Sequence, residues 1–176
     1  MRPRHQDEPA ADHAGQHHAY LQFADMQDMA RLAALQSPRT IVFDVEPLIA
    51  HWDSTNEALD RGIGLVLSQV APIPGLQLVC FATNSARRPS VIPEIPGLRV
   101  LYLASAGKPL RTAPYLELPR PGVVVGDQVL TDGLLARRLG YTFMHYLPEM
   151  SGTPLGPRLL RRGGGLVRPL LFDRDS

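Results

Sequence analysis

Acidic side chains follow two apolar segments of the chain, at the point where each segment ends. Asp44 and Glu46 come directly after 40–43, a β-branched and aromatic run, and Asp127 follows the valine-rich run 122–125. Runs of this kind predict buried strands, and an acid at a strand's tip adds nothing to its burial. In open α/β sheets the carboxyl ends of the strands carry the chemistry. These carboxylates are therefore the first candidates for a functional site.

Other polar residues follow the remaining predicted strands. Thr83 and Asn84 come after the second predicted strand, Lys108 comes after the third, and Asp132 lies five residues beyond Asp127. Acids that share one cleft raise each other's pKa unless positive charge lies among them. Lys108 supplies one positive charge, and the remaining negative excess predicts a divalent cation. Carboxylate oxygens without nearby His or Cys favour Mg²⁺ over zinc.

The elements that must position these residues alternate between strands and helices. Besides the two strands above, we predict strands at 76–81, 98–103 and 142–147, and helices at 26–36, 54–70, 110–118 and 130–139. Ser54 and Glu57 have the spacing of a capping box, and Gly140 is typical of the position beyond a helix end. Connections of this length imply right-handed parallel crossovers. The predicted fold is α/β, a three-layer sandwich around a Rossmann-like parallel sheet.

Length and composition indicate a globular protein with one core. The chain has 176 residues, a net charge of +1, and one cysteine, Cys80, inside an apolar run. The small net charge gives no reason to expect a nucleic acid partner. A single thiol forms no internal disulfide and fits a reducing compartment. No apolar run approaches the roughly 20 residues of a membrane span, and the N-terminus has no apolar signal region, so we predict a cytoplasmic protein.

The two ends of the chain differ in composition from its middle. We predict a disordered tail at 1–18, a helical segment at 19–38, an α/β domain at 39–162 and a flexible tail at 163–176. The N-terminal tail contains histidines at metal-site spacing, but nothing apolar there would hold them rigid, so a solvated tail is favoured. A short helix is predicted at 155–162. Four arginines within 158–168 are a candidate for peripheral contact with an anionic membrane.

The order of these motifs resembles that of the haloacid dehalogenase-like (HAD) superfamily of phosphohydrolases. More narrowly it resembles subfamily IIIA, the YqeG and phosphatidylglycerophosphatase-like group. Four stretches that span about 40–147 carry the resemblance: FDVEPLIAHWD, ATNSARR, GKP and VVGDQVLTDGLLARRLGY. About 30 residues separate the first motif from the second, so no cap domain fits between them. Capless members of the superfamily act on large or macromolecular substrates.

The resemblance implies a Mg²⁺-dependent phosphatase that forms an aspartyl-phosphate. Asp44 would attack phosphorus and also bind Mg²⁺. Residue 46 would bind the metal through its backbone carbonyl, and its side chain would act as general acid and base. Lys108 would neutralise the nucleophile and the phosphate, which makes Asp44, Glu46 and Lys108 the catalytic candidates.

The remaining motif residues would bind the phosphate and the metal. By the same resemblance, Thr83 would hold a phosphoryl oxygen with Asn84 beside it, Asp127 would hold Mg²⁺, and Asp132 would support the metal's ligands. The implied substrate is a phosphomonoester, with phosphatidylglycerophosphate at a membrane surface or another lipid phosphate or macromolecule as the expected partner.

The chain departs from the superfamily pattern in its first motif. Glu46 stands where the superfamily has Asp, and the extra methylene displaces the acid by about 1 Å, which can cost about 10²-fold in rate. Pro47-Leu48-Ile49 replaces the usual Asn-Thr-Leu. These changes leave an alternative: a catalytically degenerate HAD-like protein that serves as a binding or scaffolding module.

Three further side chains lie near the motifs: two arginines with a structural and a functional interpretation, and a tryptophan with a structural one. Arg87 and Arg88 follow the second motif, where arginines are usually solvated but flank the cleft closely enough to contact an anionic substrate. Trp52 is expected to pack against the helix predicted at 54–70.

Overall fold

The computed structural model describes residues 19–147 and Phe172. The predictions for the tail at 1–18 with its histidines, for the helix at 155–162 and for the arginines of 158–168 lie outside these residues. So does the tail predicted at 163–176, apart from Phe172. Within the described residues, no helix combines the length and the apolar content needed to cross a bilayer.

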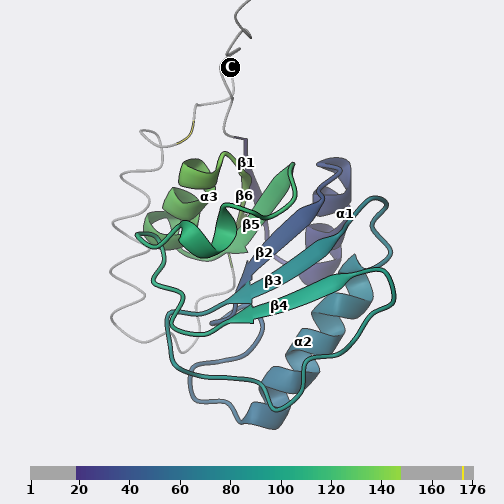
Figure 1. Cartoon of the computed structure of the whole chain (residues 1–176), viewed down its shortest axis with the longest axis vertical. Helices are drawn as coiled ribbons and strands as arrows, with labels where there is room; N and C mark the ends of the chain where they lie inside the picture. Colours follow the sequence, from purple (N-terminus) through teal and green to yellow (C-terminus); the bar gives the residue numbers. More distant parts are fainter. Residues whose placement is uncertain (1–18, 148–171, 173–176) are drawn as a thin grey trace, which may run out of the picture.

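The described residues form a six-stranded sheet in which all paired strands run parallel. The strand order across it is β1-β6-β5-β2-β3-β4. The strands are β1 (Tyr20–Phe23), β2 (Thr40–Asp44), β3 (Leu78–Ala82), β4 (Arg99–Leu103), β5 (Gly122–Gly126) and β6 (Thr142–Tyr146). The predicted α/β class with a Rossmann-like parallel sheet is thus confirmed (Figure 1).

Strand β1 corrects the expectation of a helical segment over 19–38. It pairs with β6, so that Tyr20 lies opposite Phe143. The helix after it, α1 (Met26–Leu35), matches its predicted range within one residue and is capped by Asp25, which accepts a hydrogen bond from the backbone N–H of Asp28 at 2.8 Å. A strand of four residues is too short for its period to stand out, and its partner lies at the far end of the described chain.

The central strands β2, β3 and β5 are buried at every position, as parallel strands covered on both faces must be. Alternate side chains of β2 enter opposite cores. Phe43 packs in the core under α1 and α2 (Asn56–Val70), whereas Val42 packs in the core under α3 (Leu134–Leu139). Figure 1 shows the resulting three layers, with α1 and α2 on one side of the sheet and α3 on the other.

Helix α2 starts one residue later than its sequence signal predicts. Thr55 is the N-cap residue, and its Oγ1 accepts a hydrogen bond from the backbone N–H of Ala58 at 3.3 Å. The hydroxyl of Ser54 instead donates to the carbonyl oxygen of His51 at 2.7 Å. The predicted capping box at Ser54 is therefore wrong, although the helix itself is present.

Two other predicted helices differ from the expectation, one in its extent and the other in the type of its first turn. The segment 110–118 contains only a 3₁₀ turn, Ala113–Tyr115. The helix predicted at 130–139 begins as a π-helical turn, η2 (Val129–Gly133), before α3 continues it. Gly140 ends α3 in the left-handed conformation with φ 67°, which confirms its predicted position.

Candidate functional site

Strands β2 and β5 lie side by side at the centre of the sheet, and the chain leaves them on opposite faces. From β2 it passes through α2 to β3, and from β5 it passes through η2 and α3 to β6. Such a switch in an open α/β sheet leaves a crevice beyond the carboxyl ends of the two strands. Asp44 is the last residue of β2, and Asp127 follows Gly126, the last residue of β5. The strand order therefore brings both acids to one crevice.

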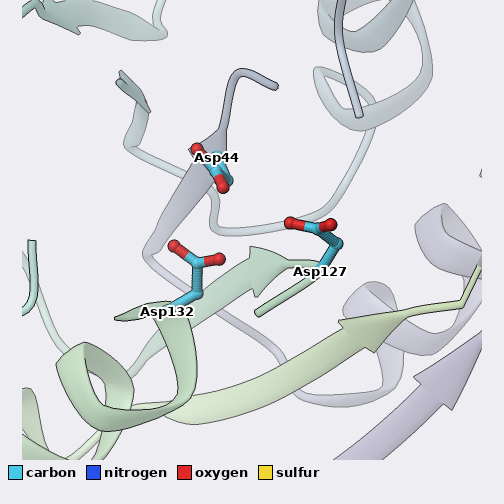
Figure 2. Close-up of side chains that lie close together, drawn as sticks. All are labelled: Asp44, Asp127 and Asp132. Carbon is cyan, nitrogen blue, oxygen red and sulfur yellow. The ribbon is translucent and has the colours of Figure 1, made fainter. Parts of the chain in front are cut away.

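Asp132 completes a cluster of three carboxylates. One oxygen from each of Asp44, Asp127 and Asp132 lies within 4.8 Å of the others, and all three residues are buried. Figure 2 shows the three carboxylates close together, with Asp44 at the tip of β2, Asp127 after β5 and Asp132 on the turn that follows. Oxygen atoms grouped in this way can bind one cation together.

The turn η2 and a glycine place Asp132 against the end of β5. The carbonyl oxygen of Gln128 accepts hydrogen bonds from the backbone N–H groups of Asp132 and Gly133, at 2.8 and 3.3 Å. This widened turn is typical of functional positions in helices. A Cβ on Gly126 would overlap the carboxylate of Asp132. Only glycine at position 126 leaves room for that carboxylate beside the strand.

Lys108 lies between two of the acids. Its Nζ is 2.7 Å from Oδ1 of Asp44 and 2.7 Å from Oδ1 of Asp132, and its side chain is 3% exposed. Burial alone would lower the pKa of Lys108, but the carboxylates of Asp132 and Asp44 outweigh it, and the pKa is raised. The ammonium is therefore charged at neutral pH. Lys108 is also the only lysine in a chain with 17 arginines.

The cluster keeps an excess of negative charge. It brings three carboxyl groups and one ammonium together, so negative charge exceeds positive charge when the aspartates are ionised. Burial raises the pKa of Asp44, the neighbouring Asp132 adds to the rise, and Lys108 opposes it. A divalent cation would offset this charge. The donor set consists of carboxylate oxygens only, which fits a hard cation such as Mg²⁺, with Asp44, Asp127 and Asp132 as its ligands.

Glu46 lies beside the cluster and contacts the loop after β3. Its Oε2 accepts a hydrogen bond from the hydroxyl of Thr83 at 2.6 Å, and its Oε1 accepts one from Ser85 at 3.4 Å. The two hydroxyl groups are 2.9 Å apart. The carboxylate of Glu46 thus bridges the first and second motifs and stands outside the group of three aspartates that could hold a metal.

Asn84 has a different position from Thr83. Its Oδ1 accepts a hydrogen bond from the backbone N–H of Lys108 at 2.8 Å, and its Nδ2 donates to the carbonyl oxygen of Lys108 at 3.0 Å. The amide therefore fixes the loop that carries the lysine. This pairing explains how a side chain from the second motif supports the third.

A cavity of about 130 Å³ opens at these residues. Asp44, Glu46, Thr83, Asn84 and Lys108 all line it, so five of the seven site residues predicted from the sequence meet there, with Asp127 and Asp132 in the adjoining cluster. Sequence reasoning did not assign four further lining residues to the site: Trp52, Ser85, Gln128 and Thr131. Each follows a motif acid or hydroxyl by one to eight positions, and that proximity was the available signal.

Comparisons of the chain with protein-family models, with curated proteins and with solved structures give no match. The geometry of the site is therefore the basis for the functional interpretation.

Proposed function

We propose that this chain is a Mg²⁺-dependent phosphomonoesterase of the HAD-like type with Asp44 as its nucleophile. The observation that carries the proposal is the convergence of Asp44, Asp127 and Asp132 around Lys108 beyond the ends of β2 and β5. Each of these four charged residues is at most 7% exposed, and burying charge is costly. A phosphoryl group bound together with a divalent cation gives each of them a role.

The proposed reaction has two steps on Asp44. Asp44, Asp127 and Asp132 would hold Mg²⁺, which would supply positive charge to the phosphoryl oxygens. A carboxylate oxygen of Asp44 attacks phosphorus, the ester P–O bond breaks, and the alcohol leaves with a proton. Water then attacks the aspartyl-phosphate, which releases inorganic phosphate and restores the carboxylate. Lys108 holds the attacking carboxylate in place and offsets charge as the phosphoryl group transfers.

Glu46 is the candidate for the acid that protonates the leaving alcohol and then accepts a proton from the water. Its carboxylate lines the cavity and is fixed by the hydroxyl groups of Thr83 and Ser85. That contact also favours a second function. The hydroxyl of Thr83, expected to hold a phosphoryl oxygen, donates to Glu46 instead, and this arrangement suits a module that binds metal without turnover.

Phosphate release from 4-nitrophenyl phosphate tests the proposal. We expect Mg²⁺-dependent release by the wild-type chain and a loss of at least about 10³-fold in Asp44→Asn, because the nucleophile is removed. Asp28→Asn, which changes an exposed carboxylate on α1, is the matched control and should keep full activity. Phosphatidylglycerophosphate in vesicles belongs in the same substrate panel, because the sequence resemblance implies it.

Substitutions of Glu46 separate the two functions. If the chain is an enzyme, Glu46→Gln loses activity because the acid is gone. An inactive wild-type chain with an active Glu46→Asp variant would favour the binding module, since the shorter side chain would free Thr83 and restore the superfamily's acid. Calorimetry then measures whether the chain binds Mg²⁺. A chain that neither hydrolyses phosphomonoesters nor binds the ion would refute both the phosphatase and the binding module.

A further inference from the structure

Trp52 lines the cavity among otherwise polar side chains. The other lining residues in the described part of the chain are Asp, Glu, Thr, Asn, Ser, Lys and Gln. Trp52 is half-buried, and it is the only tryptophan in the sequence. We propose that Trp52 contacts the leaving group of the substrate and selects phosphomonoesters of aromatic alcohols. This inference rests on the proposed phosphatase for its kinetic test and extends it to a substrate class.

The loop that carries Trp52 is held by the guanidinium of Arg87. Nη1 donates to the carbonyl oxygen of His51 at 2.8 Å, and Nη2 donates to the carbonyl oxygens of Ser54 and Thr55, each at 2.7 Å. Nη2 is also 3.0 Å from the hydroxyl of Ser54. These hydrogen bonds fix the backbone on both sides of Trp52. The guanidinium is thus engaged by the protein itself and not by the cavity, which favours a positioning role over contact with an anionic substrate.

The same arginine connects the Trp52 loop to the predicted phosphate-binding loop. The backbone N–H of Arg87 donates to Oγ of Ser85 at 3.3 Å, and Ser85 in turn contacts Thr83 and Glu46. The position of the indole is therefore tied to Thr83 and Ser85, whose side chains line the same cavity. A ligand held by its phosphate would have its leaving group placed by the same framework.

An indole in the lining of a polar cavity favours one kind of leaving group. The phosphoryl end of the substrate would bind Lys108, the hydroxyl groups and a divalent cation held by the carboxylates, and the ester's organic part must extend outward. A planar aromatic ring can pack on the indole with a favourable ring–ring geometry, whereas glycerol offers hydroxyl groups that gain nothing there. The His51 ring packs against the indole in a T-shaped arrangement, with the ring centroids 5.2 Å apart and the ring planes at 83°.

Inorganic phosphate release from phenyl phosphate and from glycerol 3-phosphate tests the inference. We expect Trp52→Ala to lower the ratio of kcat/KM for phenyl over glycerol phosphate by about fivefold, the worth of one aromatic pair, and Trp52→Phe to retain most of it. Arg87→Ala should lower the same ratio because the loop loses its anchor. Arg88→Ala, at the exposed neighbouring arginine, is the matched control and should leave the ratio unchanged. A phosphotyrosine peptide in the panel distinguishes an aryl phosphate on a polypeptide from a free one.

A binding measurement keeps this inference separate from the phosphatase proposal. With Mg²⁺ present, phenyl phosphate should protect the emission of Trp52 from acrylamide quenching, and glycerol 3-phosphate should not. If the ratio of kcat/KM is the same in Trp52→Ala and wild type while hydrolysis persists, the inference fails and the phosphatase stands. If hydrolysis is absent but phenyl phosphate still protects Trp52, the phosphatase fails and the aromatic site stands. Absence of both hydrolysis and protection overturns both.

Discussion

Replacing Lys108 with methionine keeps an unbranched side chain, one heavy atom shorter, and removes its charge. The ammonium is 2.7 Å from a carboxylate oxygen of Asp44 and of Asp132, and the two carboxylate side chains are 10% and 0% exposed. Removal of one partner from a buried ion pair costs about 3–5 kcal/mol. In the variant, the carboxylate of Asp132 would have no access to water, whereas the carboxylate of Asp44 would be partly hydrated. We therefore expect a loss of about 4 kcal/mol in the free energy of unfolding without metal, or about 12 °C in Tm.

The loss in Lys108→Met should depend on pH. Burial and Asp132 already raise the pKa of Asp44 in the folded state, and removal of the lysine raises it further. An acid with a raised folded-state pKa carries no penalty below its unfolded pKa of about 3.9, and the penalty grows until the pH passes the folded-state pKa. The difference in stability between the wild type and the variant should therefore shrink as the pH falls from about 7.5 toward 5.

Urea unfolding in EDTA, followed by the emission of Trp52, measures this difference. Arg111→Met removes an exposed cation three residues from the lysine and should cost less than about 0.5 kcal/mol. Added Mg²⁺ should recover part of the loss in Lys108→Met, since the cation supplies charge to the same carboxylates. A loss of less than about 1 kcal/mol in Lys108→Met, or an equal loss at both pH values, would refute the view that this ammonium neutralises a buried acidic cluster.

Three further outcomes follow from the same structure. Gly126→Ala should abolish Mg²⁺ binding, measured by calorimetry, because the new Cβ displaces Asp132. Gly64→Ala is the matched control: the position has open space in helix α2, and the substitution should raise the free energy of unfolding by about 1 kcal/mol. Lys108 should resist acylation in the folded chain and react in urea, as mass spectrometry would show, because it is buried and its pKa is raised; rapid native labelling would contradict this. Cys80 should likewise resist iodoacetamide at pH 8 in the folded chain and react in urea, since burial raises the pKa of its thiol to about 12.

The sheet was predictable where the relevant signal is local. The runs around β2 and β5 are apolar at nearly every position, and a strand buried on both faces needs nothing else to be recognised. The acids at their tips then followed from the general rule for parallel sheets, so Asp44 and Asp127 were expected at one edge. β1 was not predicted because it is a strand only through its pairing with β6, and the residues near it in the sequence carry no signal of that pairing.

The details of the site depend on contacts between distant residues. Ser54 and Thr55 are both good N-cap residues, but the hydroxyl of Ser54 is engaged by the carbonyl oxygen of His51 and by Arg87, and Thr55 caps the helix. Likewise, the sequence places an acid at position 46 but does not say where its longer side chain reaches. The contact between Glu46 and Thr83 joins residues 37 positions apart, and only the packed structure shows it.

The pairing of β1 with β6 sets an order of events during synthesis. Residues 20–23 leave the ribosome long before the strand that pairs with them, which ends at Tyr146. Until then their backbone N–H and C=O groups have no neighbouring strand in this sheet, and contacts of such large sequence separation form slowly. The edge beside β6 is thus completed only after β2, β5 and η2 have been translated with Asp44, Asp127 and Asp132, so the acidic cluster can form in the nascent chain before β1 docks.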